Sequence, residues 1–163
     1  MTAAAMVIAA SACLACARVA GEFFAFSRFV MQALARIPAS HGIGAMQAIS
    51  VVVINRSFRG LFFGGAPLSL LAAGLAVSQW GSAAAICTVA GADLYLVGTS
   101  LVMAFGNIPL NDRLAGVTAT DPRAAAVWAR DLRRWTRWNH VRTLCALAAA
   151  AAYLAGLLPS GAG

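Results

Sequence analysis

The chain has 163 residues, of which 61% are hydrophobic and 10% charged, and its mean hydropathy is +0.80. A soluble domain carries about 25% charged residues, so this composition excludes one and predicts a helical membrane protein. The formal net charge of +7 could suggest a nucleic-acid partner. The arginines instead flank apolar segments, so anionic lipid headgroups and topology explain the charge better, and no nucleic-acid partner is expected.

The first predicted span covers residues 3–26. No basic segment precedes it, and Arg18 and Glu22 interrupt the zone where a signal peptide would be cleaved, so a retained span is expected. Cys13 and Cys16 form a C-x-x-C pattern within it. Because they lie in mid-span and no cysteine lies in a loop, they are interpreted as small buried residues.

The first predicted cytoplasmic loop covers residues 27–60. Its beginning, 27–42, is basic and contains a proline and a glycine. The following segment, Ile43–Phe58, is apolar only as far as Ile54, about 18 Å of helix and too short to cross a bilayer. It is therefore predicted to be an amphipathic or re-entrant helix between the first two spans.

Three further spans are predicted, at residues 61–79, 83–105 and 138–158. A short turn joins the second to the third. The second cytoplasmic loop, 106–137, joins the third to the fourth, and Asp121 within it is expected to cap a helix that continues into the fourth span. The predicted fold class is therefore all-α, a four-helix transmembrane bundle in one domain, 1–163, with one extra helix.

The arginine distribution predicts the orientation. Positively charged loops stay in the cytoplasm, so both long loops are expected there, with the N- and C-termini outside. The expected location is a bacterial inner (cytoplasmic) membrane. The expected partners include the lipid bilayer, and the sequence leaves a homodimer open.

Several polar residues fall within or beside these spans. An ionisable residue inside a membrane costs about 2.5–3.5 kcal/mol on insertion scales, so each requires a partner or a role. Asp93, near mid-membrane, is expected to pair with Arg18. If Arg18 pairs with Glu22 instead, Asp93 is left unexplained and the hypothesis of a proton relay gains support. Other polar residues are expected near one depth at the cytoplasmic end: Glu22, Gln47, Asn55, Asn107, Asn111, Asn139, His140 and Arg142.

This cluster could carry proton-transfer chemistry. His140 or Glu22 could act as a general base, with Arg142 stabilising a developing oxyanion or enolate. Trp135 and Trp138 could enclose a flat aromatic substrate. Amide groups would bind the same substrate, and the candidates are Asn107, Asn111, Asn139 and Gln47. The competing interpretation is structural: the amides cap or turn the chain, His140 and Arg142 meet headgroups, and the aromatic residues pack.

A metal site has less support. His41, His140 and Glu22 would form a two-histidine, one-carboxylate set only if the first loop folded back onto the spans. The spacing of the two histidines does not favour haem ligation either. No metal is therefore expected.

Four stretches spread through nearly the whole chain carry a resemblance to a known family. They are 21–34 (GEFFAFSRFVMQAL), 45–49 (AMQAI), 107–115 (NIPLNDRLA) and 135–143 (WTRWNHVRT). In these stretches the sequence resembles the anthrone-oxygenase-like family of small membrane proteins. Ser50 stands where members commonly carry asparagine, so no amide role follows there. The resemblance implies a four-span bundle. It also implies, from the characterised fungal members, oxidation of a lipophilic anthrone by O₂ without an added cofactor.

Three functions are therefore weighed. The first is a cofactor-independent oxygenase acting on a lipophilic anthrone-like or phenolic molecule. The second is a non-enzymatic membrane component, a lipid-binding or partner-stabilising subunit whose polar cluster holds the helices in register. The third is a small proton-coupled carrier with Glu22, Asp93 and Arg18 as a relay, although four spans without a broken-helix pair argue against a complete transporter.

Overall fold

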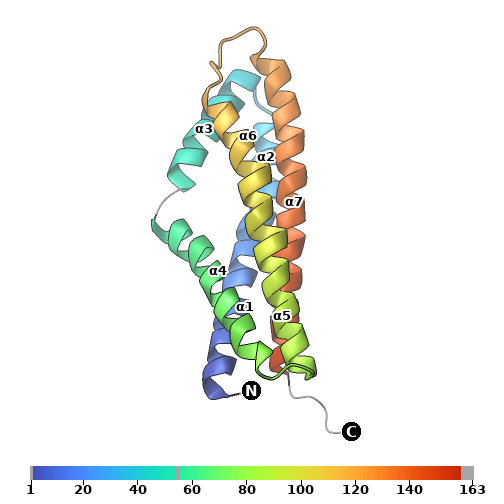
Figure 1. Cartoon of the computed structure of the whole chain (residues 1–163). Coiled ribbons are helices and arrows are strands. Elements are labelled where there is room, and N and C mark those ends of the chain that lie inside the picture. Colours follow the sequence, from blue (N-terminus) through green and yellow to red (C-terminus); the bar gives the residue numbers. More distant parts are fainter. Residues whose placement is uncertain (1, 54–55, 159–163) are drawn as a thin grey trace.

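The computed structural model describes the backbone of residues 2–53 and 56–158, and the side chains of 2–53 and 64–158. The described residues are about 87% helical and contain no strand. Figure 1 shows long helices running side by side along one axis. Three of them are long and apolar enough to cross a bilayer, as expected of a membrane protein.

The first long helix runs without interruption over Ala3–Leu34. It consists of α1 (Ala3–Ala25), a π-helical segment η1 (Phe26–Val30) and α2 (Met31–Leu34). The hydroxyl of Thr2 accepts a hydrogen bond from the Ala5 N–H and caps its start. The predicted loop at 27–42 is therefore wrong in its first part. The π-helical segment continues the helix past residue 26. Pro38 disfavours helical backbone in the residue before it, so the helix ends shortly before Pro38.

The next part of the chain consists of two helices, α3 (Ala39–Val53) and α4 (Arg56–Val77). Figure 1 shows α3 turning back from the end of α2, and α4 continuing to the opposite end of the molecule. The extra helix predicted at Ile43–Phe58 is present as α3, although it begins four residues before Ile43, and residues 56–58 belong to α4. Its predicted continuation through Ile54 and Asn55 lies outside the described residues. The helix predicted at 61–79 begins earlier, at Arg56, and its described apolar part, Gly64–Val77, is shorter than a full span.

The third long helix covers Ala83–Ala115. It begins after a turn in which Gly81 has φ +98° and Ser82 caps the helix through the Ala85 N–H. Its segments are α5 (Ala83–Tyr95), η2 (Leu96–Leu101), η3 (Met103–Asn107) and α6 (Ile108–Ala115). The predicted end at residue 105 is wrong, because the helix continues to Ala115. Pro109 does not end it, since it lies at the start of α6, where a proline is tolerated.

The last helix, α7 (Ala124–Leu157), has 34 residues and continues from the basic segment into the apolar one, as predicted. Asp121 does not cap it directly. Its carboxylate accepts the Arg123 N–H at 2.7 Å and closes a turn before the helix. Only residues 116–123 of the predicted loop at 106–137 lie between α6 and α7.

The helices contact each other in a ring. Helix α1 packs on α7, α7 on α5, α5 on α4, and α4 on α1. Figure 1 shows the N-terminus, the C-terminal end of α7 and the 78–82 turn at one end of the molecule. The connections after α2 and α6 lie at the other end, called here the loop end. Small residues allow close approach; Gly98 of η2, for example, faces Cys145 of α7 so closely that a Cβ would clash.

Candidate functional site

One face of α7 carries polar and aromatic side chains into the interior. Trp135, Asn139 and Arg142 follow one another at helical spacing, and they are 6%, 0% and 4% exposed. Burial of an amide and a guanidinium in a membrane protein requires hydrogen bonds or a counter-charge. Three of the predicted site residues therefore lie together on one buried face of α7.

Asn139 is the hub of the hydrogen bonds. Its Nδ2 donates to the Phe23 carbonyl of α1 at 2.6 Å and also to the Ser27 hydroxyl of η1. Its Oδ1 accepts from Arg142 Nε at 2.8 Å. One side chain therefore joins α7 to the first helix and orients the guanidinium.

Arg142 lies against two aromatic rings. Its Cζ atom is 3.9 Å from the centre of the Phe23 ring and 5.2 Å from the Trp135 ring, within the range of cation–π attraction. No carboxylate among the described residues forms an ion pair with it. Since buried charges are normally paired, Arg142 is suited to an anion, and its surroundings are suited to a flat one.

Two asparagines of the third helix hold Trp135. Asn107, 1% exposed, donates from Nδ2 to the Trp135 carbonyl at 3.1 Å. Asn111 accepts the indole N–H of Trp135 at 2.8 Å. The Oδ1 of Asn107 has no hydrogen-bond partner in the described part of the chain. It is thus an acceptor available to a ligand or a water.

The other predicted binding residues lie at the edge of this cluster. Gln47 of α3 donates to the carbonyls of Leu114 and Val117 at 2.9 and 3.0 Å, which ties α3 to the end of α6. Trp138 is 41% exposed and packs against Gly106. Asn55 lies outside the described residues. Gln47 and Trp138 therefore have clear structural roles where they lie.

The two candidate bases have different surroundings. His140 is exposed on the outer face of α7, next to Asn139 in sequence but pointing away from it. Glu22 is half-buried on α1, directly before Phe23, and lies close enough to Tyr95 to interact electrostatically. The fold therefore brings Glu22, and not His140, toward the interior.

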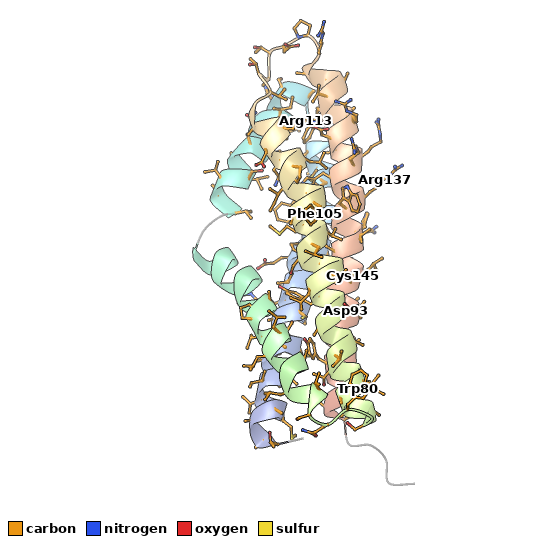
Figure 2. All side chains as sticks on the ribbon, in the orientation of Figure 1. Trp80, Asp93, Phe105, Arg113, Arg137 and Cys145 are labelled. Atoms are coloured by element: carbon orange, nitrogen blue, oxygen red, sulfur yellow. The ribbon has the colours of Figure 1, made fainter. Side chains whose placement is uncertain are left out.

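The predicted Arg18–Asp93 pair is wrong. Arg18 Nε lies 3.9 Å from Glu22 Oε1, four residues along the same helix. Asp93 is exposed on the outer face of α5, where Figure 2 labels it. Position along an Ala-rich helix predicts depth but not which way a side chain points. The proposed relay of these three charges is thus not assembled within one chain.

Comparison with known proteins identifies the family of this chain. A family model described as anthrone oxygenase matches residues 56–152. The chain belongs to the anthrone oxygenase family. No curated protein and no solved structure gives a match.

The anthrone oxygenase match covers most of the cluster described above. Trp135, Asn139 and Arg142 of α7 lie inside it, as do Asn107 and Asn111. Glu22 and Gln47 lie before its first residue. The matched range therefore includes the α7 face and the third helix and does not include the first helix.

Sequence reasoning missed Asp131, because it was placed in a loop. It is 3% exposed on the same α7 face, one turn before Trp135, and forms an ion pair with Arg113 of α6. It lines a small pocket with Trp128 and Trp135. The available signal was the spacing, since Asp131 precedes Trp135 and Asn139 at intervals of four residues and therefore shares their helical face. His41 is exposed on α3, and the described residues contain no group of three or more metal-binding side chains.

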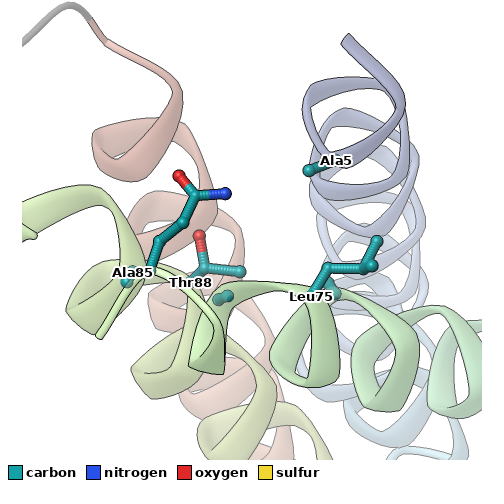
Figure 3. A pocket seen from close by; sticks show the side chains of 7 residues that line it. Ala5, Leu75, Ala85 and Thr88 are labelled. Atoms are coloured by element: carbon teal, nitrogen blue, oxygen red, sulfur yellow. The ribbon is translucent and has the colours of Figure 1, made fainter. Parts of the chain in front are cut away.

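The pockets are small. The one beside Asp131 and a second one near the 78–82 turn each leave about 10 Å³ for the centre of a water molecule, enough for a single water. Figure 3 shows the second pocket, among Ala5, Leu75, Ala85 and Thr88. Neither of these two pockets holds a three-ring molecule.

Replacing Asn139 tests how much its hydrogen bonds contribute to stability. We expect Asn139→Ala to lower the free energy of unfolding by about 2–3 kcal/mol, because it removes three hydrogen bonds and leaves buried groups of α1 and Arg142 unpaired. Equilibrium unfolding in detergent measures this. The control is Gln32→Ala, an exposed amide of α2, whose loss should cost less than about 0.5 kcal/mol. Equal, small effects would show that Asn139 does not hold the helices together.

Proposed function

We propose that the protein is a membrane-bound oxygenase that binds a lipophilic, anthrone-like or phenolic molecule as its anion and oxidises it with O₂, without an added cofactor. Family membership supports the reaction class. The observation that carries the proposal is Arg142, a buried guanidinium without a carboxylate partner among the described residues and in contact with two aromatic rings.

The chemistry places modest demands on the protein. Removing a benzylic proton from an anthrone gives an enolate, in which the negative charge is spread over a flat ring system. The enolate is electron-rich enough to reduce O₂, which forms a C–O bond at the same carbon. The resulting peroxide anion takes back the proton that the base removed and becomes a hydroperoxide. Loss of water from that hydroperoxide gives the anthraquinone. The protein must supply a base, a cation beside the enolate oxygen and an environment from which water is excluded.

The residues of the cluster divide these tasks. Arg142 would face the enolate oxygen, and the free Oδ1 of Asn107 would accept a hydrogen bond from a phenolic hydroxyl of the substrate. Trp135 and Phe23 would stack on the rings. Glu22 is the proposed base, because it is half-buried directly before Phe23, whereas His140 is exposed on the outer face.

The position of the arginines supports a proposed orientation of the protein in the membrane. Arg28 and Arg36 lie near the loop end of the first long helix, and several others lie in the first half of α7. Positively charged segments stay in the cytoplasm, so we propose that the loop end is cytoplasmic and both termini lie outside. A bacterial inner membrane is the proposed location.

Oxygen uptake tests the proposed function. Purified protein in detergent should consume O₂ when anthrone is added and release anthraquinone, faster than anthrone oxidises with heat-denatured protein at the same pH. Chromatography of the product and an oxygen electrode measure the two quantities. Uptake equal to the denatured control with every anthrone and phenol offered would contradict the proposal.

A second candidate is a non-enzymatic membrane component. It is favoured by the amide contacts, since Gln47, Asn111 and Asn139 all join one helical element to another or to a side chain of α7. For such a protein, the cluster holds the helices in register and no ligand protects it. Thermal unfolding with and without anthrone separates the two functions, because only a binding site gives protection.

A further inference from the structure

The outer face of α7 changes character along its length. Arg130, Arg134 and Arg137 are exposed at helical spacing in its first half. Val141 and Leu144 continue the same face, 41% and 66% exposed. One continuous surface is therefore cationic at the loop end and apolar toward the middle of the molecule.

The neighbouring helix extends both halves of this surface. Arg113 of α6 lies close enough to Arg130 and Arg134 for the three charges to repel one another. The ion pair with Asp131 compensates only one of them. Three guanidinium groups with one carboxylate leave a net charge of about +2, which attracts an anion carrying more than one oxygen.

The third long helix also extends the apolar half of this surface. Phe105 of η3 is 80% exposed, more than any other large apolar side chain described in the structure. It adjoins Gly106, against which the half-exposed Trp138 of α7 packs. Figure 2 shows Arg113 nearest the loop end, with Arg137 and Phe105 farther along the axis. Eight residues separate Phe105 from Arg113, about 12 Å of helix.

These dimensions and charges match one class of molecule. A phospholipid carries a phosphate at the membrane surface and acyl chains beside it in the hydrocarbon. Tryptophan rings favour the boundary between the two. A soluble anion would use the arginines and leave Phe105, Val141 and Leu144 uncovered, whereas a neutral lipid would leave the arginines unpaired.

We infer that the α6–α7 face holds an anionic phospholipid, with its phosphate on Arg113, Arg130 and Arg134 and its acyl chains along Phe105 and Val141. The inference goes beyond the proposed oxygenase function, since this surface is exposed on the outside of α6 and α7, whereas Arg142 is buried. It assigns the surplus arginines of α7 a specific ligand in addition to their role in topology.

Native mass spectrometry from nanodiscs with equal amounts of phosphatidylglycerol and phosphatidylcholine tests this inference. The wild-type protein should retain phosphatidylglycerol preferentially. An arginine near a membrane surface contributes about fivefold in affinity for anionic lipid. The double variant R130Q/R134Q should therefore lower retention of phosphatidylglycerol by about 25-fold. Phe105→Ala should lower it as well, and because Phe105 is exposed this variant should fold normally.

The matched control is R28Q/R36Q, which removes the same charge from exposed positions of the first long helix and the turn after it. It should change retention less than twofold. Equal loss in both double variants would overturn the inference in favour of general charge attraction. Equal retention of the two lipids by the wild-type protein would also overturn it. So would displacement of the lipid by inorganic phosphate or by a short RNA, because the ligand would then be a soluble anion or a nucleic acid.

Discussion

Arg142→Met is expected to lower the rate of anthrone oxidation by about 100- to 1000-fold, the usual cost of removing a group that stabilises an oxyanion. Methionine fills similar space in the contact with Phe23 and Trp135, so the rings should stay in place. Oxygen uptake at saturating anthrone measures the rate. Arg28→Met, the same substitution at an exposed position of η1, should leave it unchanged.

The stability of the same variant separates catalysis from structure. A buried cation without a counter-ion is costly, so its removal should offset the loss of the hydrogen bond to Asn139. We expect the free energy of unfolding to change by less than about 1 kcal/mol. A large fall in stability with an unchanged rate per folded molecule would contradict the proposed role and favour a structural one.

Glu22→Gln is expected to lower the rate of oxidation by about 100- to 10,000-fold, the range typical of a lost general base. Its effect on stability should be small, because the pair with Arg18 is partly exposed and joins residues of one helix, and such pairs contribute about 0.3–0.5 kcal/mol. Solvent exchange of the benzylic proton under anaerobic conditions, followed by NMR, measures proton removal independently of O₂.

The control for this prediction is His140→Ala, because His140 is the other titratable residue of the predicted site. It is exposed on the outer face of α7 and should leave the rate within about twofold of the wild type. Glu22→Asp should restore part of the lost rate. Loss of proton exchange in His140→Ala, with normal exchange in Glu22→Gln, would reverse the assignment of the base.

The fold could be predicted from the sequence to the level of apolar segments and their order. Long apolar runs indicate where the helices lie and in which order they follow one another. The ends were predicted less well, because the helices continue beyond the apolar runs. At Phe26–Val30 the chain stays helical through a π-helical segment, and at Pro109 a proline falls where a helical segment begins. Neither feature changes the hydropathy of the chain.

The candidate site could be predicted by depth but not by direction. Trp135, Asn139 and Arg142, three of the predicted site residues, are buried together in the structure. His140 was included because it follows Asn139, yet one residue rotates a helix by about 100° and turns it to the outside. In the first span the alanines that surround Arg18 give no clear apolar face, so its partner could not be predicted. Contacts between helices determine which way these side chains point.

An anaerobic titration with anthrone tests the central claim most directly, namely that Arg142 binds the substrate as an anion. The enolate absorbs at longer wavelength than neutral anthrone, so its formation is visible in a difference spectrum before any O₂ is added. We predict a long-wavelength band that saturates with wild-type protein and is absent with Arg142→Met. No band in the wild type, or equal bands in the two proteins, would contradict the account.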